Sequence, residues 1–214
     1  YRGEGNSLTP KKAAEIMTRT RKEYGVNRMA ISGGESTLNR PWLVQYIKEL
    51  KSLNPDKNAR FHVDTNGSLL TKDYIDELVE AGMTDVGIDL KSLNTETFMH
   101  ITGLRDEKLV EKYKNTAWNA TKYIIDNYKD KVFLGIGIPY NKDLTSIKEI
   151  RQMGMEIVKI DPEVQVCVLD YFPQFRRRDI SRPSYWEMVE VQRVLKETGL
   201  KTVTCQTERG HIGP

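Results

Sequence analysis

The chain has 214 residues, of which 38% are hydrophobic and 29% are charged, and its formal net charge is +3. This length and composition predict one domain over residues 1–214 with a single substantial core. No apolar run approaches the roughly 20 residues that span a bilayer, and the small net charge gives no argument for nucleic acid. Two cysteines without a disulfide framework fit a reducing, cytoplasmic setting.

In chain order, helix and strand signals alternate. Thr9 is placed as an N-cap with Pro10 at the first helical position, and this helix is expected to end at Tyr24, before Gly25. Further helices are expected over residues 41–53, 72–81, 95–101, 108–127, 144–153 and 184–198. Strands are expected over residues 28–32, 59–64, 85–90, 132–138, 164–169 and 201–206. Repeated strand-helix units predict an α/β fold with a parallel sheet and right-handed crossovers.

Two adjacent glycines and a carboxylate follow the first strand, at Gly33, Gly34 and Glu35. Glycine has no Cβ to keep a ligand away from the main chain, so its N–H and C=O groups can meet the ligand directly. Glu35 can accept a hydrogen bond from a cationic donor. The combination suits a zwitterion with an ammonium group, although two glycines after a strand also fit a simple tight turn.

Three more strands end in polar residues. The second ends at Asp64-Thr65-Asn66-Gly67, the third at Asp89-Leu90-Lys91, and a later one at Asp170-Tyr171. In a parallel sheet the carboxyl ends of the strands lie at one edge, where ligands bind. We therefore expect these groups to gather around one ligand.

The ordered set Ser-Gly-Gly-Glu-x-Thr-Leu, Asp-Thr-Asn-Gly and Asp-Leu-Lys resembles the radical S-adenosylmethionine (SAM) enzymes. The resemblance is nearest to the activating enzymes of glycyl-radical proteins such as pyruvate formate-lyase. It implies a partial (β/α)6 barrel of the TIM type. It also implies SAM and a 4Fe-4S cluster as cofactors, a glycyl-radical protein as substrate, and an electron donor such as flavodoxin or ferredoxin.

The resemblance also implies roles for individual residues. Backbone carbonyls of Gly33 and Gly34, with Glu35, would face the amino group of SAM. Asp64 and Thr65, followed by Asn66 in a turn, would lie beside its methionine end. Asp89 and Lys91 would reach the ribose and the carboxylate, although an exposed ion pair at a strand end is the structural alternative. The activases place a histidine near the adenosine after residues 169–172; this chain has none there, and Tyr171 or Phe172 can stack on the base instead.

The largest departure from the family concerns the cluster. The family holds it with three cysteines spaced Cys-x3-Cys-x2-Cys, and this sequence has only Cys167 and Cys205, which fit core positions. We expect that the first strand and the cluster loop of the family are missing from this chain. The alternative is a natural relative that binds a nucleotide-like ligand without radical chemistry.

The substrate is open at this stage. Phe175 and the three arginines that follow it can form a loop over the ligand edge that binds an acidic peptide, a phosphate or RNA, or can be a solvated charge run. A radical enzyme that modifies RNA or a small metabolite is therefore the alternative to an activase. His62 and His100 have no visible ligand set. Residues 206–214 are expected to form a flexible surface tail, and a return across the barrel mouth is the alternative.

Overall fold

The computed structural model describes residues 7–174 and 177–214. Its helices are α1 (Pro10–Tyr24), α2 (Arg40–Leu53), α3 (Lys72–Ala81), α4 (Thr95–Thr102), α5 (Glu107–Tyr128), α6 (Ile147–Ile160) and α7 (Tyr185–Glu197), with the short 3-10 helix η1 (Ser36–Leu38). Its strands are β1 (Arg28–Ile31), β2 (Arg60–Thr65), β3 (Asp85–Asp89), β4 (Phe133–Tyr140), β5 (Gln165–Asp170), β6 (Val203–Thr207) and β7 (Gly210–Ile212). Within these residues, no helix combines the length and apolar character of a membrane span.

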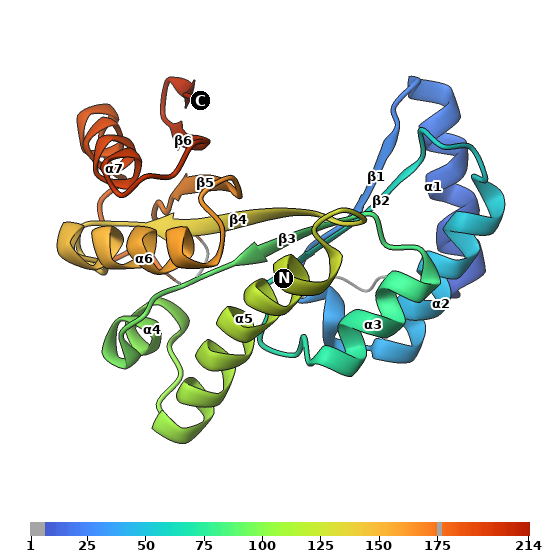
Figure 1. Ribbon diagram of the computed structural model, residues 1–214, viewed down its shortest axis with the longest axis horizontal. Coiled ribbons are helices and arrows are strands. Elements are labelled where there is room, and N and C mark those ends of the chain that lie inside the picture. Colours follow the sequence, from blue (N-terminus) through green and yellow to red (C-terminus); the bar gives the residue numbers. More distant parts are fainter. Residues whose placement is uncertain (1–6, 175–176) are drawn as a thin grey trace.

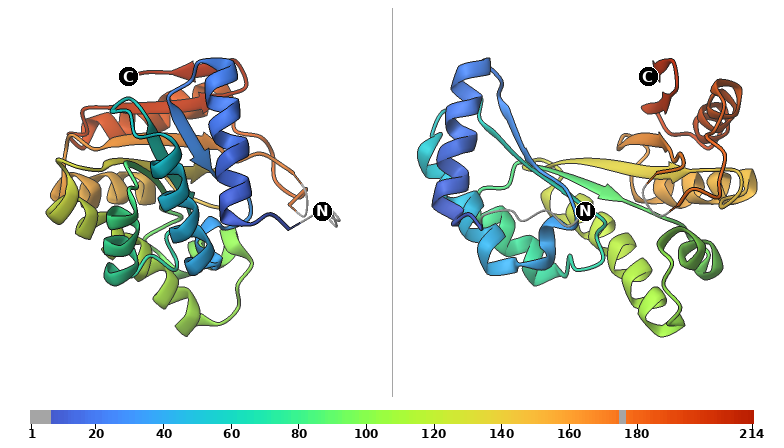
Figure 2. Two further views of the ribbon diagram at one scale, coloured as in Figure 1. Left: turned by 90° about the vertical axis from the view of Figure 1, so that its right-hand side faces the viewer. Right: turned by 180° about the vertical axis from the view of Figure 1, so that it is seen from behind.

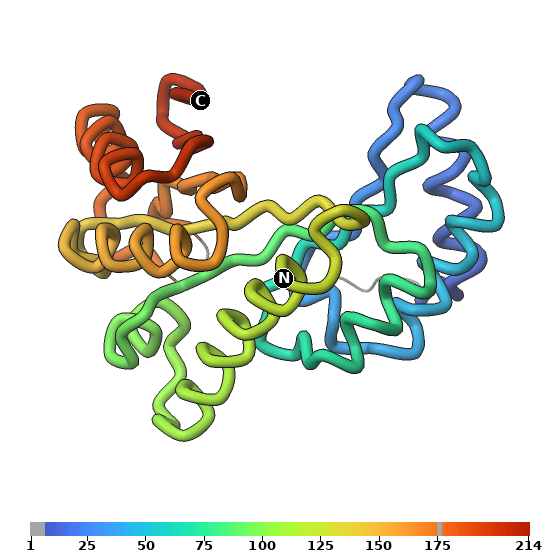
Figure 3. Tube along the Cα trace, viewed as in Figure 1, coloured from blue at the N-terminus to red at the C-terminus, as the bar shows by residue number. Residues whose placement is uncertain are grey.

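The strands form one strongly curved sheet in the order β1-β2-β3-β4-β5-β6-β7 (Figure 1). All neighbours from β1 to β6 are parallel, and only β7 runs antiparallel, beside β6. The helices lie outside the curve, and the sheet stays open between β1 and its β6–β7 end, as the view from behind also shows (Figure 2). The expected open barrel of strand-helix units is confirmed, and the tube trace follows its alternation (Figure 3).

Local capping explains where the helices begin and end. Thr9 accepts a hydrogen bond from the Lys12 backbone N–H at 3.2 Å, and Gly25 ends α1 with a φ of 64°. At α7, Ser184 and Glu187 form a reciprocal capping box. Each cap satisfies backbone groups that a helix end leaves without an intrahelical partner. These boundaries agree with the sequence because caps depend on neighbouring residues alone.

Helix α6 begins and ends later than the sequence predicts. The expected start at residue 144 is wrong because the Asn141 carbonyl closes a turn with the N–H groups of Leu144 and Thr145, and Ser146 then caps the helix. The helix also continues past Gly154 to Ile160. A Cβ on Gly154 would lie 2.9 Å from Leu195 Cδ2, so this glycine allows α6 and α7 to pack closely.

The carboxyl-terminal segment also differs from the expectation. Residues 210–212 form β7, with Gln206 opposite His211 and Thr207 opposite Gly210, so the predicted flexible tail is wrong. Gly210 turns the chain with a φ of 109°, and the Thr207 hydroxyl donates to its carbonyl. Ile212 then packs against the core, which stabilises a hairpin that the short sequence pattern did not reveal.

The two faces of the sheet are filled differently. The outer face packs against the helices in a continuous apolar core that includes Val63, Ile88 and Val168, all fully buried. Facing the concave side, β3 and β4 carry Gly87, Gly135 and Gly137 instead of large side chains. The fold therefore places an open space inside the curve, along β4 as well as the strands whose ends the sequence marked.

Candidate functional site

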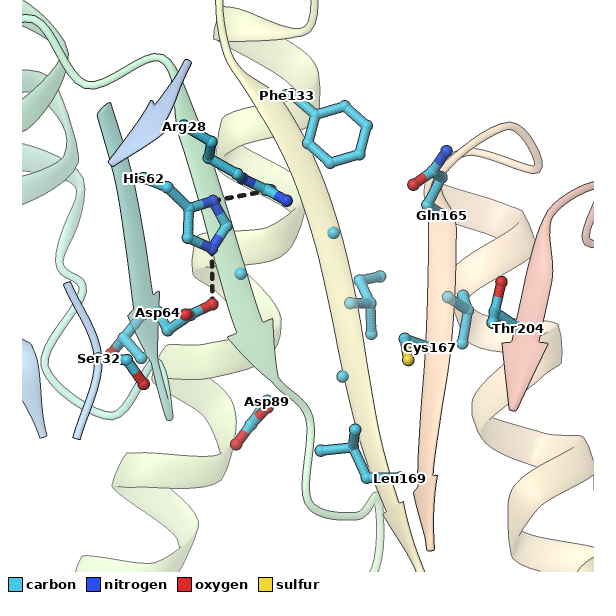
Figure 4. Close-up of a pocket in the computed structure, with 16 residues that line it drawn as sticks. Arg28, Ser32, His62, Asp64, Asp89, Phe133, Gln165, Cys167, Leu169 and Thr204 are labelled. Carbon is cyan, nitrogen blue, oxygen red and sulfur yellow. Dashed lines mark hydrogen bonds and ion pairs between the residues drawn. The ribbon is translucent and has the colours of Figure 1, made fainter. Parts of the chain in front are cut away.

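The concave side of the sheet encloses a cavity of about 450 Å³, which we call the inner chamber. Its lining comes from β1 to β6, and Figure 4 shows the polar side chains that point into it. The glycines of β3 and β4 make this space: a Cβ on Gly87 would lie 2.5 Å from Asp64 Oδ1, and one on Gly137 would lie 2.4 Å from Asp89 Oδ1. The two carboxylates thus occupy room that a larger residue would take.

A hydrogen-bonded chain of three side chains lies on one wall of the inner chamber (Figure 4). Arg28 Nη2 lies 2.9 Å from His62 Nδ1, and His62 Nε2 lies 2.6 Å from Asp64 Oδ1. His62 is buried, whereas 45% of the Asp64 side chain is exposed. Asp64 therefore stands at the inner end of a fixed polar chain and remains open to the chamber.

The loop after β1 carries the glycine pair. Gly33 and Gly34 have φ values of 86° and 52°, a backbone conformation that favours glycine. Apart from their chain neighbours, no atom of residues 7–174 and 177–214 lies within 4 Å of the Cβ position of either glycine, so this side of the loop is open among the described residues. The loop therefore leaves bare backbone accessible at these two positions.

Glu35 ties the ends of β1 and β2 together. Its Oε1 accepts hydrogen bonds from the Thr37 N–H and hydroxyl and from the Thr65 hydroxyl at 2.5 Å, while Oε2 accepts from the Asn66 N–H at 2.8 Å. The Asn66 side chain in turn accepts from the Ser68 N–H at 2.9 Å. The Asn66 amide thus serves the turn, and Glu35 organises the edge where it was expected to bind a ligand.

Asp89 and Lys91 form an ion pair at the end of β3, with Lys91 Nζ 2.8 Å from Asp89 Oδ2. Only 20% of the Lys91 side chain is exposed, so this pair is more enclosed than an ordinary surface ion pair. Asp89 lines the inner chamber, and Lys91 lines a second cavity of about 510 Å³, which we call the outer cavity. The pair therefore stands between the two spaces.

Tyr171 lies in the outer cavity together with Phe172 and Lys91. Its N–H donates to the Tyr140 carbonyl at 2.9 Å, and its carbonyl accepts from the Asn141 side chain at 2.8 Å. Leu169 lines both cavities, so they adjoin beneath the carboxyl edge of β5. The structure thus gathers all the predicted site residues along one edge, from Gly33 to Tyr171.

The arginine loop is partly fastened to the protein. Arg177 Nη1 donates to the His100 carbonyl at 2.6 Å, and its Nε lies 3.1 Å from Asp179 Oδ1. Phe175 and Arg176 lie outside the described residues. Arg177 therefore holds the loop against α4, and its guanidinium is already engaged by carbonyl and carboxylate oxygens.

The model of the radical SAM superfamily matches residues 1–154, about 72% of the chain. The chain belongs to the radical SAM superfamily. The matched part includes every predicted site residue except Tyr171. The chain is similar to a probable GTP 3',8-cyclase from Methanococcus aeolicus, with 35% identity over 96 residues that cover 45% of this chain and 31% of that protein. A probable GTP 3',8-cyclase from Saccharolobus solfataricus is 22% identical over 203 residues, covering 90% of this chain and 59% of that protein.

Solved structures share the radical SAM fold of this chain. A domain of pyruvate-formate lyase-activating enzyme from Bacteroides vulgatus superposes with a TM-score of 0.61 at 16% identity, covering 82% of this chain and 96% of that chain. Streptococcus suis SuiB bound to S-adenosylmethionine gives a TM-score of 0.71 at 16% identity, covering 95% of this chain and 45% of that chain. The chain spans less than two thirds of the length of the curated relatives given above.

The described residues do not fit the iron-sulfur cluster that the radical SAM family implies. Cys205 is fully buried in the apolar core, and burial raises the pKa of its thiol to about 12. Cys167 lines the inner chamber, and burial, with the nearby Asp89 charge, raises the pKa of its thiol as well. The family's cluster needs three thiolate ligands, whereas this sequence has two cysteines, one on β5 and one on β6. Among residues 7–174 and 177–214, no group of three His, Cys, Asp or Glu side chains is placed to hold a metal ion.

Sequence reasoning missed much of the inner chamber. It treated His62 as an isolated histidine, whereas the structure joins it to Arg28 and Asp64. Arg28 begins β1 and Asp64 lies near the end of β2, so no local spacing connects them. The available signal was the β2 alternation, which places His62 and Asp64 on one side of the strand.

Proposed function

We propose that this chain binds SAM along the carboxyl edge of the sheet and acts as the SAM-binding core of a radical enzyme. The observation that carries the proposal is the continuous edge, in which the inner chamber and the outer cavity adjoin at Leu169 and the Asp89–Lys91 pair stands between them. SAM has a charged amino-acid end, a ribose and a flat base. Along the edge, from the loop after β1 to the outer cavity, there are partners for these three parts of SAM in that order.

At the amino-acid end, open backbone at Gly33 and Gly34 and the carboxylate of Asp64 provide acceptors for an ammonium group, and Glu35 holds this edge in place through Thr65 and Asn66. Lys91 is a point-charge donor suited to a carboxylate, and Asp89 accepts hydrogen bonds from ribose hydroxyls. In the outer cavity Tyr171 provides an aromatic face for the base. Bound SAM would supply the 5′-deoxyadenosyl group: when one electron from a donor cleaves its sulfonium C5′–S bond, methionine leaves and the 5′-deoxyadenosyl radical can abstract a substrate hydrogen.

The protein's part in this chemistry is to orient SAM and to keep water from the reacting end. Gly87, Gly135 and Gly137 leave the inner chamber open beside the methionine end, which gives a substrate a place next to SAM. We derive no step through a cluster, because the described residues hold no ligand set for one. The alternative that follows from this is a SAM-binding protein without radical chemistry.

Two substrate classes have separate support. The sequence relatives are named GTP 3',8-cyclases, which favours a small nucleotide. The resemblance of the sequence motifs to activating enzymes favours a glycyl-radical protein as partner, with a flavodoxin or ferredoxin as electron donor. Calorimetric titration of GTP into the SAM-saturated chain separates the two classes. Heat of binding would support a nucleotide substrate, and no heat of binding would remove GTP as the substrate.

The test of SAM binding uses isothermal titration calorimetry on the wild-type chain and on the variants Asp89→Ala and Lys91→Ala. Each variant should weaken SAM binding about tenfold to a hundredfold, since a hydrogen bond to a charged group contributes about 1.5–3 kcal/mol. The control is Lys122→Ala, which breaks the exposed Lys122–Asp126 ion pair on α5 and should leave SAM affinity unchanged. Unchanged affinity in both site variants would refute the assigned ribose and carboxylate contacts.

A further inference from the structure

The contacts of His62 fix which of its nitrogens carries the proton. A guanidinium has only donors, so Nδ1 of His62 must accept the hydrogen bond from Arg28 Nη2 at 2.9 Å. A neutral imidazole then carries its proton on Nε2, and this N–H donates to Asp64 Oδ1 at 2.6 Å. His62 therefore gives Asp64 a hydrogen bond and no positive charge.

This arrangement holds Asp64 in place but leaves its negative charge for a ligand. His62 uses only Oδ1, and 45% of the Asp64 side chain remains exposed, so acceptor positions stay open. Gly87 contributes as well, because a Cβ there would lie 2.5 Å from Asp64 Oδ1 and 3.4 Å from His62 Nε2. The glycine therefore leaves room for this orientation of the carboxylate, and Figure 4 shows His62 between Arg28 and Asp64.

We propose that His62 is a positioning residue that orients Asp64 to accept from the ammonium group of SAM, and that Arg28 fixes the tautomer that His62 needs for this. The inference rests on the proposed SAM binding and extends it to two residues that do not touch SAM. Arg28 acts from the opposite end of the inner chamber wall, where its Nη2 also lies 3.9 Å from Asp85 Oδ1. Asp85 in turn holds Arg60, with Arg60 Nε 3.0 Å from Asp85 Oδ2.

The proposal separates ligands by their amino-acid end. SAM has an amino-acid end with the ammonium group, whereas 5′-methylthioadenosine keeps the nucleoside and a neutral thioether sulfur and lacks that end. If His62 acts through Asp64, its loss weakens SAM binding and spares 5′-methylthioadenosine. If His62 only supports the fold, its loss weakens both ligands together.

Calorimetry with both ligands tests this on the wild-type chain and on His62→Leu, His62→Gln and Arg28→Leu. His62→Leu should weaken SAM about tenfold or more, and change 5′-methylthioadenosine by no more than about twofold. Glutamine keeps an N–H that can reach Asp64, so His62→Gln should recover most of the SAM affinity. Arg28→Leu should give an intermediate loss for SAM alone. Lys122→Ala, which breaks the exposed Lys122–Asp126 ion pair on α5, is the control and should change neither affinity.

Equal losses for both ligands in His62→Leu, or no loss for SAM, would overturn the role of His62 while leaving SAM binding by the wild-type chain intact. Failure of the wild-type chain to bind SAM would overturn the proposed function and this inference with it. A readout on the wild-type chain does not depend on any variant folding: ¹⁵N NMR should show His62 protonated on Nε2 alone at neutral pH. Protonation on Nδ1 would overturn the proposal.

Discussion

Gly137→Ala should impair SAM binding with little effect on folding. The Cβ of alanine at this position would lie 2.4 Å from Asp89 Oδ1, well inside van der Waals contact, which for carbon atoms begins at about 3.5 Å. The Asp89 carboxylate is the end of a short side chain on the chamber wall, so it can turn away, at a cost of about 0.5–1.5 kcal/mol for leaving its rotamer. The fold therefore survives, but the acceptor for the ribose moves.

The expected loss of SAM affinity follows from the hydrogen bond that the displaced Asp89 carboxylate no longer makes. Losing a hydrogen bond between a ribose hydroxyl and a charged group removes about 1.5–3 kcal/mol, which corresponds to about tenfold to a hundredfold weaker binding. The matched control is Gly135→Ala, two residues earlier on the same face of β4, where the nearest atom to the new Cβ is Phe133 Cε1 at 3.7 Å, an ordinary contact. Calorimetry with SAM and a thermal melt measure both variants. Equal SAM affinities for Gly137→Ala and Gly135→Ala would refute the role of Asp89.

Three further predictions concern stability. Glu35→Gln should lower the free energy of unfolding by about 1–2 kcal/mol in chemical denaturation, because an amide nitrogen at the Oε2 position would face the Asn66 N–H, also a donor. Ser184→Ala should remove about 1 kcal/mol by breaking the cap of α7, which lowers Tm by about 2–4 °C in calorimetry, and an unchanged Tm would contradict the cap. The hydrogen bond from Arg21 lowers the pKa of Asp56 from 3.8 to about 2. The stability that this ion pair contributes is therefore present above pH 3.8 and lost as pH falls through about 2. Asp56→Asn should lower the free energy of unfolding at pH 7 but not below about pH 2, as urea denaturation at the two pH values would show.

The order of elements was predictable because each depends on nearby residues. Thr9 and Gly25 bound α1 by capping geometry, and alternating apolar residues mark β2 and β5 as strands. The predicted boundaries were wrong where a residue far along the chain determines the local structure. Helix α6 runs on past Gly154 because α7 packs against that glycine, and β7 forms because β6 is beside it.

The residues of the candidate site were predictable from the sequence, but their contacts with one another were not. Motifs at strand ends identified the carboxyl edge, because all strand ends of a parallel sheet meet there. The sequence could not show whether Asp89 and Lys91 pair at the surface or between two cavities. That depends on the outer cavity, which is lined by residues from several elements. The sequence also could not show that Glu35 is held by donors from Thr37, Thr65 and Asn66, since two of these lie 30 residues or more along the chain.

The sequence by itself determined the alternation of strands and helices, the position of the glycine pair and the set of polar residues at the strand ends, because local backbone preferences and side-chain periodicity encode these features. Only the tertiary structure decided what lies inside the curved sheet. There Gly87 and Gly137 leave room for the carboxylates of Asp64 and Asp89, and Arg28 on β1 reaches His62 on the adjacent β2. These contacts arise from strand register and sheet curvature, which bring together side chains far apart in the chain.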